Sequence, residues 1–343
     1  MSLLLKALAG DPEIEALLSD DAQLAAMLQF EAALAAAEVK AGLIGQPAAA
    51  AIADGIARFV PDWSDLLVGM ARDGVAVPAL VRQLRNAVGE PHAKDLHRGA
   101  TSQDVIDTAL MLQVAKIIPI LMARIVQLEA TLASLADRHG LRPLMAHTRM
   151  QAALLFTVAD KLRTWSEPLS RHRRALSAMR PELLVIQLGG PVGDRAGFDG
   201  RGEIVAKALA EELDLGVALP WHSMRDPLVT FGNRLAGLAG SLGKFGADVA
   251  LLAQSEVATI TVKMAGGSSA MPHKANPVAA ELLVALARHT AGLSSSLQHA
   301  MVHENERSGA AWTLEWLTLP PLLVSTGASL ATANRLATSI SFH

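Results

Sequence analysis

The run TSQDVIDTALMLQVAKIIPILMARIVQLEATLASLADRHG, residues 101–140, decides the fold. Its apolar side chains surround a helical path on nearly every side, which is typical of a helix at the centre of a bundle. Thr101 or Ser102 is a suitable N-cap, and Gly140 ends the run. A membrane-spanning helix needs about 20 apolar residues with few charges. The run is therefore predicted to be a core helix of a soluble protein, because polar residues interrupt it at Asp107, Gln113, Lys116, Arg124 and Glu129.

Further long helices are predicted on the C-terminal side of this run. Residues 227–263 and 277–302 would each exceed the average helix of about 11–12 residues. The first of these carries glycines that either let neighbouring helices approach closely or mark a break into two helices, namely Gly232, Gly237, Gly240, Gly243 and Gly246. Ala and Leu are abundant and alternating runs are few, so the predicted fold class is all-α.

The N-terminal part consists of shorter pieces. Residues 19–39 predict a helix that Ser19 caps and Gly42 ends, and loop-like stretches recur from there to residue 100. We therefore expect a small helical N-terminal domain at 1–100 and a central long-helix bundle domain at 101–343.

Composition narrows the possible functions. The 343 residues carry 30 Lys and Arg against 33 Asp and Glu, so they lack the basic excess of a general nucleic-acid binder. With 51% hydrophobic and 18% charged residues, the chain is predicted to bury surface in a homo-oligomer. The absence of cysteine and tyrosine excludes thiolate and phenol chemistry. Without a targeting segment or metal-ligand spacing, we expect a cytoplasmic protein with no metal, cofactor, nucleic-acid or membrane partner.

The segment GGSSAMPHKANP, residues 266–277, lies between two predicted long helices. Its glycines and prolines prevent helix and predict an exposed loop. Such a loop could close over an anion with its backbone N–H groups, with Lys274 as a point charge and Asn276 as a neutral donor. The alternative is that Asn276 and Pro277 only begin the next helix, as its N-cap and first residue.

Two more segments concentrate polar side chains. In HRGATSQD, residues 97–104, the start of the long helix would attract an anion, unless Thr101 or Ser102 is only its cap. In MAHTRMQ, residues 145–151, Arg149 is a good carboxylate ligand but a poor acid or base, because a guanidinium does not deprotonate in proteins. His147 is either a proton carrier or a buried structural histidine.

The loop resembles the signature of the fumarase/aspartase superfamily, G-S-S-x-M-P-x-K-x-N. Every fixed position is matched, by Gly267, Ser268, Ser269, Met271, Pro272, Lys274 and Asn276. Residues 97–104 are similar to the family's H-x-G-x-T-S-x-D, whereas residues 145–151 depart from its R-T-H-x-Q by placing His147 and Arg149 in the other two positions. The resemblance implies a homotetramer with a central long-helix bundle and active sites shared by three subunits.

The resemblance also implies a chemistry and a role for each residue. A proton moves on the carbon next to a carboxylate while a C–O or C–N bond forms or breaks. Ser268 is implied as the catalytic group, and Lys274 and Asn276 as support for the carboxylate that takes on a second negative charge. His147 is a further candidate proton carrier. Candidates for substrate binding are His97, Thr101, Ser102, Arg149, Gln151, Ser269, Met271, Arg225 and Arg307, and the three arginines could instead form ion pairs.

Within the superfamily the sequence is most similar to the cycloisomerase branch, which interconverts an unsaturated tricarboxylate and its lactone without a cofactor. The agreement includes QLGG at 187–190, PWHSMRD at 220–226 and HENER at 303–307. The alternatives are a lyase acting on a succinyl adduct such as adenylosuccinate, and a non-catalytic helical scaffold. The chain is too short for the full C-terminal helical domain that is common in the family.

Overall fold

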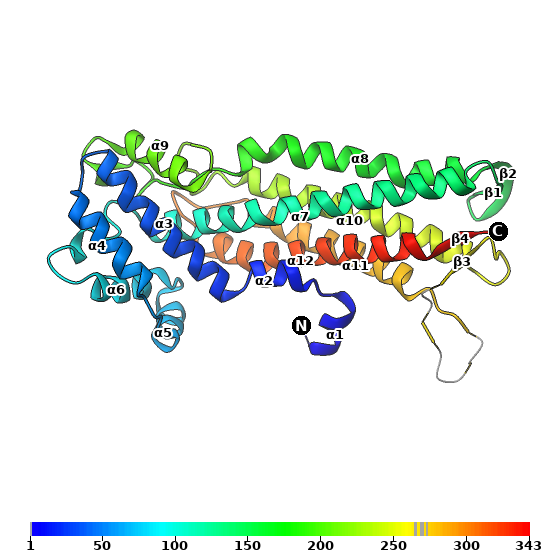
Figure 1. Ribbon diagram of the computed structural model, residues 1–343, viewed down its shortest axis with the longest axis horizontal. Helices are drawn as coiled ribbons and strands as arrows, with labels where there is room; N and C mark the ends of the chain where they lie inside the picture. Colours follow the sequence, from blue (N-terminus) through cyan, green and yellow to red (C-terminus); the bar gives the residue numbers. More distant parts are fainter. Residues whose placement is uncertain (1, 264–265, 268–270, 272–273) are drawn as a thin grey trace.

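The computed structural model describes residues 2–263, 266–267, 271 and 274–343 (Figure 1). Within this part of the chain, long helices lie side by side and form an elongated bundle. They are α7 (Ser102–His139), α8 (Val158–Leu183), α10 (Asp226–Leu252), α11 (Val278–His299) and α12 (Gly309–Ser339). The predicted all-α class with a central bundle of long helices is therefore confirmed.

The shorter helices gather mainly at one end of the bundle, around the start of α7 (Figure 1). These are α3 (Asp20–Lys40), α4 (Gln46–Ala57), α5 (Trp63–Asp73), α6 (Val77–Val88) and α9 (Gly202–Leu213). Ser19 caps α3 as predicted, because its hydroxyl accepts a hydrogen bond from the N–H of Ala22 at 3.2 Å. The first two helices, α1 (Leu3–Ala9) and α2 (Pro12–Leu17), lie against α12.

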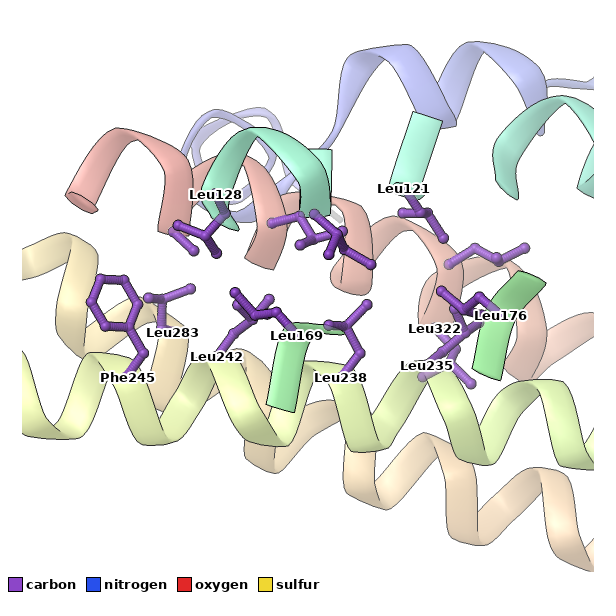
Figure 2. Packing of buried hydrophobic residues seen from close by; sticks show 14 of the residues in the cluster. Leu121, Leu128, Leu169, Leu176, Leu235, Leu238, Leu242, Phe245, Leu283 and Leu322 are labelled. Atoms are coloured by element: carbon purple, nitrogen blue, oxygen red, sulfur yellow. The ribbon is translucent and has the colours of Figure 1, made fainter. Parts of the chain in front are cut away.

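Leucine side chains from the long helices fill the interior of the bundle (Figure 2). Figure 2 shows them converging from α7, α8, α10, α11 and α12, at Leu121, Leu128, Leu169, Leu176, Leu235, Leu238, Leu242, Leu283 and Leu322, together with Phe245. Burying one such side chain contributes about 1.5–3 kcal/mol relative to leaving it exposed. Hydrophobic burial along the whole bundle therefore gives the polar segments a rigid support.

Close packing explains some of the glycines in α10. A Cβ added to Gly246 would lie 2.5 Å from the carbonyl oxygen of Ala280 on α11, so this glycine lets the two helices meet. Gly240, by contrast, has only open space around it within the described residues. α10 runs unbroken through its glycines but ends at Leu252, not at residue 263 as predicted. The chain then forms β3 (Ile260–Val262), which pairs antiparallel with β4 (Ile340–Phe342).

A β-hairpin that the sequence did not predict projects from the far end of the bundle (Figure 1). Its strands are β1 (Pro143–Thr148) and β2 (Gln151–Thr157). The two-residue turn consists of Arg149 and Met150, with φ of +50° and +66°. Turns of this kind normally use Asn, Asp or Gly. The usual sequence signal of a hairpin was therefore missing.

The hydrophobic clusters do not follow the predicted boundary at residue 101. The largest cluster fills the bundle, and a second lies at the end where the short helices gather. The second cluster joins residues of α3 and α6 to Val105 and Ala109 of α7 and to Val205 and Leu209 of α9. The core at that end is thus shared across residue 101, and the division into two domains stays a prediction.

Two of the described helices, α7 and α10, are long and apolar enough to cross a membrane by length and composition alone. Half of the residues in each apolar window are buried inside this chain. Because an apolar core helix meets the same criterion, the observation is compatible with the core role predicted for residues 101–140.

Candidate active site

The polar segments found in the sequence lie far apart within one chain (Figure 1). Residues 97–104 lead into α7 beside the N-terminal helices, whereas the hairpin with residues 145–151 lies at the opposite end of the bundle. Lys274 and Asn276 directly precede α11, which begins toward the hairpin's end. One chain therefore does not bring the three segments together.

Asp104 fastens the start of α7 to a neighbouring glycine-rich segment. Its buried carboxylate accepts hydrogen bonds from the N–H groups of Gly189 at 2.8 Å and Gly190 at 2.9 Å. It also accepts from Nε2 of His222 at 2.9 Å and from the N–H of Thr101 at 3.0 Å. A Cβ on Gly189 would lie 2.7 Å from Cε1 of His222, so only glycine fits there. Asp104 is thus a structural residue that holds the N-terminus of α7 in place.

A cavity of about 490 Å³, which we call the α7 pocket, opens between α6 and the segment that leads into α7. Its polar lining residues are Arg82, Arg85, Asn86, His97, Thr101 and Ser102. Arg82 is already paired with Asp65 at 2.5 Å, and one nitrogen of Arg85 donates to the carbonyl of Leu96 at 3.2 Å. Hydroxyls, an imidazole and a guanidinium beside a helix N-terminus form a pocket suited to a carboxylate.

His97 lines this cavity in a left-handed backbone conformation, with φ of +62°. Its Nδ1 lies 2.6 Å from Oε1 of Glu31, whose side chain is fully buried. Burial lowers the pKa of His97, but the charge of Glu31, its hydrogen bond and the charge of Asp104 raise it more, so the net pKa lies above the ordinary value. The imidazole therefore holds its proton more readily than an ordinary histidine.

Arg307 reaches the first turn of α7 from the loop between α11 and α12. Its Nε donates to Oε1 of Gln103 at 2.9 Å, and Nη2 donates to the carbonyl of Pro191 at 3.2 Å. The amide nitrogen of Gln103 in turn donates to Oδ2 of Asp107 at 3.2 Å and to the carbonyl of His222 at 2.9 Å. The exposed guanidinium is therefore held beside the predicted anion site, with Nη1 unused by the described residues.

Arg225 lies elsewhere than its predicted role requires. Its side chain is fully buried, and the guanidinium donates to both oxygens of Asp107 and to both oxygens of Glu315. A fifth contact reaches the carbonyl of Trp221 at 3.5 Å. A guanidinium has five N–H groups, so none remains for a substrate. We therefore correct the prediction that Arg225 binds substrate: it is the inter-helix ion pair that was the alternative.

The hairpin presents its polar side chains to solvent. His147, Arg149 and Gln151 are all exposed, and none of the three side chains makes a hydrogen bond to another described residue. His147 is therefore not buried within this chain. Its role as a proton carrier stays a prediction.

The described residues at the two ends of the signature loop are hydrogen-bonded to each other. Gly266 and Asn276 exchange two backbone hydrogen bonds, of 2.8 Å and 2.9 Å, and Nδ2 of Asn276 donates to the carbonyl of Gly267 at 3.3 Å. Pro277 is the N-cap of α11, so Asn276 is not the helix cap that was its alternative role. Ser268, Ser269 and Pro272 lie outside the described residues.

An exposed cavity of about 710 Å³ lies next to these paired loop ends. Met271, Lys274 and Asn276 line it together with Gln254, Ser255, Glu256 and Glu281. Lys274 thus lines a cavity at the hairpin's end of the bundle, whereas Thr101 and Ser102 line the α7 pocket at the other end.

Sequence reasoning missed two residues that contact proposed site residues at the start of α7: Glu31, which pairs with His97, and Gln103, which accepts from Arg307. Glu31 stands in the Ala-rich sequence of α3, where a carboxylate among apolar residues was the available signal. Gln103 was part of a quoted motif, but its contact with Arg307 joins residues 204 positions apart and has no local signal. Among the described residues, no group of three His, Asp or Glu side chains could hold a metal. The expected absence of a metal or cofactor stays a prediction.

Comparisons with known proteins give a consistent result. The sequence model of a protein family described as lyase matches residues 11–292. The chain is 42% identical to the 3-carboxy-cis,cis-muconate cycloisomerase of Pseudomonas aeruginosa over 316 residues, which cover 90% of this chain and 69% of that protein. It is 37% identical to the enzyme of the same name from Acinetobacter baylyi over 342 residues, covering 96% and 75%.

The fold comparison agrees with the sequence comparison. The solved structure of a 3-carboxy-cis,cis-muconate lactonizing enzyme from Pseudomonas putida superimposes with a TM-score of 0.93 at 39% identity. The match covers 100% of this chain and 78% of that one. It therefore includes all three polar segments described above.

Proposed function

The chain belongs to the fumarase/aspartase superfamily of lyases, and we propose that it is a cycloisomerase that interconverts 3-carboxy-cis,cis-muconate and its lactone, 4-carboxymuconolactone. The observation that carries this function is the carboxylate-suited pocket at the start of α7, on a scaffold shared with enzymes that carry out this reaction. The reaction belongs to aromatic catabolism, in the β-ketoadipate pathway.

The reaction needs positioned charges and a proton carrier but no redox step. In the direction of lactone formation, one carboxylate adds across a double bond and forms a C–O bond. The carbon next to a second carboxylate becomes an aci-carboxylate, which then accepts a proton and forms a C–H bond. In reverse, the proton leaves and the C–O bond breaks. All atoms of the lactone come from the substrate and one proton, so we propose that no cofactor takes part.

We assign the catalytic steps to the signature loop and the hairpin. Ser268 delivers the proton and removes it in reverse, and His147 is the second candidate for this step. Lys274 and Asn276 stabilise the doubly charged carboxylate; one such donor is typically worth about 3–4 kcal/mol. The exposed positions of His147 and Lys274 support this assignment, because a group that serves a neighbouring subunit must be accessible.

Substrate binding is assigned to both ends of the bundle. Thr101, Ser102 and His97 hold one carboxylate at the N-terminus of α7, and Arg307 contacts Gln103 on the first turn of that helix. Arg149, the exposed cation at the tip of the hairpin, holds another. Gln151, Ser269 and Met271 complete the proposed set of substrate-binding residues.

We propose that these residues meet in a homotetramer with shared active sites. The separation of the segments within one chain supports this, since no single copy places the hairpin beside the α7 pocket (Figure 1). Apolar side chains in and beside the hairpin also support it: Leu141 is 97% exposed and Leu154 is 78% exposed. Large apolar side chains left so exposed commonly mark an interaction surface. A cytoplasmic location is part of the same proposal.

The experiment that tests the function is an ultraviolet scan of the purified protein with 3-carboxy-cis,cis-muconate. The conjugated diene absorbs and the lactone does not, so turnover appears as a loss of absorbance. Adenylosuccinate serves as the competing substrate, for the alternative that the chain is a succinyl-adduct lyase. Turnover of adenylosuccinate alone would establish that alternative, and no turnover of either would leave the non-catalytic scaffold.

A further inference from the structure

A buried carboxylate of α3 faces the imidazole of His97. Oε1 of Glu31 lies 2.6 Å from Nδ1, and the exposed fraction of the Glu31 side chain is 0% against 14% for His97. We assign Nδ1–H as the donor and Oε1 of Glu31 as the acceptor of this hydrogen bond. The contact joins residues 66 positions apart and is not part of the signature motifs.

The second ring nitrogen of His97, Nε2, is not used by Glu31. Nε2 has no hydrogen-bond partner among the described residues, and it is not fully buried. His97 lines the cavity with Thr101 and Ser102. With Nδ1 occupied by Glu31, Nε2 is the nitrogen that an incoming anion would meet.

Charged groups from three elements act on this imidazole. Glu31 from α3 and Asp104 from α7 favour its cationic form, whereas Arg85 from α6 and burial oppose it. The balance raises the pKa of His97. Farther along α3, Glu38 faces Arg98 and Asp95, and burial above all raises its pKa to about 8. Glu38 is not among the groups that act on His97, and of the two carboxylates that do, Glu31 is the one in direct contact with the ring.

The backbone at His97 also needs support. Its φ of +62° lies in the left-handed region, which disfavours residues other than glycine. The contact with Glu31 helps to hold this conformation, which aims the ring into the cavity. Position and charge of the imidazole thus depend on the same carboxylate.

We propose that Glu31 is a positioning residue for His97: it fixes the ring through Nδ1 and keeps it cationic, so that Nε2–H binds a substrate carboxylate at the start of α7. The proposal rests on the proposed function for the identity of the substrate. Without Glu31, burial, which is the largest effect, and Arg85 disfavour the charged imidazole, and only Asp104 still favours it. The anion would then lose a cationic partner at neutral pH while the fold of the pocket remains.

The first experiment follows His97 directly in the full-length protein. The protein is labelled with ¹³C at the histidine Cε1 positions, and His97→Gln identifies the signal of His97. In wild type, this signal should titrate above the ordinary value of about 6.5. In Glu31→Gln it should titrate below that value. Glu38→Gln is the matched control, because it removes a buried carboxylate of the same helix that makes no contact with His97.

The second experiment measures anion binding with citrate, an unreactive tricarboxylate, between pH 6 and pH 8.5. Citrate affinity of Glu31→Gln should fall at least about tenfold more than that of wild type as the pH rises, the lower bound for a lost charge-assisted contact. With active protein, the KM of Glu31→Gln should rise at pH 8 and recover at pH 6, with kcat little changed. Glu31→Asp, which keeps the charge, should restore part of the affinity.

An unchanged His97 titration in Glu31→Gln would overturn the proposal. So would a loss of citrate binding that is equal at pH 6 and pH 8, because a purely structural carboxylate predicts no recovery on acidification. If Glu31→Gln does not fold, Glu31→Asp decides: a His97 titration at or below the ordinary value contradicts the proposal, and one still above it supports it. The titration needs no turnover, so failure of the proposed reaction would leave this result readable.

Discussion

Arg225 and Glu315 form a fully buried bidentate ion pair, with Nε 2.8 Å from Oε1 and Nη2 2.5 Å from Oε2. Asp107 accepts from Nη1 at 2.6 Å and from Nη2 at 3.2 Å, along the adjacent edge of the same guanidinium. The contacts join the start of α10 to α12 and α7, and Asp107 also accepts from Nε2 of Gln103, which binds Arg307. One buried cation thus ties the start of α10 and the N-terminal part of α12 to the second turn of α7.

Arg225→Met should lower the free energy of unfolding by about 3–5 kcal/mol, because it leaves two buried carboxylates without their counter-charge. Thermal and denaturant unfolding measure the effect. Arg58→Met is the matched control: Arg58 pairs with Asp54 at the surface, where the loss should stay below about 1 kcal/mol. If Arg225→Met is as stable as wild type but has a raised KM, Arg225 binds substrate after all.

Glu38→Gln should stabilise the protein at pH 8 and have little effect near pH 5. Both carboxylate oxygens of Glu38 are buried without a hydrogen-bond partner among the described residues, and burial raises the pKa to about 8. Because the folded state then holds a proton that the unfolded state releases, stability falls as the pH rises from about 4.5 through about 8. The variant avoids this loss, and we expect a gain of roughly 1–3 kcal/mol at pH 8.

Melting temperatures at pH 5 and pH 8 check the Glu38 prediction. Glu167→Gln, at an exposed carboxylate of α8, should change stability equally at both pH values. A Glu38→Gln effect that does not grow with pH would show that Glu38 is ionised in the folded state.

Ser268→Ala should abolish turnover while the assembly and its melting temperature stay nearly unchanged. Ser268 lies outside the described residues, so the prediction rests on its place in the signature GSSAMPHKAN. Ser295→Ala, at an exposed serine of α11, is the control and should keep full activity. If Ser268→Ala retains more than about a tenth of the wild-type rate, a barrier change under about 1.4 kcal/mol, Ser268 is not the proton carrier.

Inactive chains should complement each other if active sites are shared. Ser268→Ala removes the proposed proton carrier and Thr101→Val removes a ligand at the far end of the bundle, so a mixed tetramer can contain some intact sites. Each variant is unfolded and refolded alone and with the other, and activity is measured against the mixing ratio. No recovery at any ratio, with tetramers confirmed, would contradict the shared site.

The parts of the fold that the sequence predicted have local signals. α7 begins at the Thr101–Ser102 cap and ends next to Gly140, as its apolar pattern and its end residues indicated. The turn of the hairpin was missed because Arg149 and Met150 replace the residues that such a turn normally uses. The end of α10 was placed too late because no glycine or proline marks Leu252.

The site was predictable only where a motif carried it. Thr101 and Ser102 could be linked to anion binding from their place at a helix start, and the structure lines a cavity with both. The contact between Glu31 and His97 could not, because it depends on packing between α3 and the segment before α7. The role of Arg225 was left open for the same reason: whether an arginine faces substrate or Asp107 is decided by tertiary structure.

Arg149→Met should erase most of the preference for the tricarboxylate over cis,cis-muconate, which lacks one carboxylate. Arg149 is the exposed cation at the hairpin tip, and a charge-assisted contact left unmatched typically costs about 1.5–3 kcal/mol. Wild type should therefore favour the tricarboxylate by roughly 10–150-fold in kcat/KM. Arg163→Met, at an exposed arginine of α8, should keep that preference. Arg149→His need not yield an adenylosuccinate lyase, because the nucleotide would still lack a pocket. If wild type has equal kcat/KM for the two muconates, Arg149 does not recognise the third carboxylate. The hairpin then has no need of a fixed cation for substrate selection.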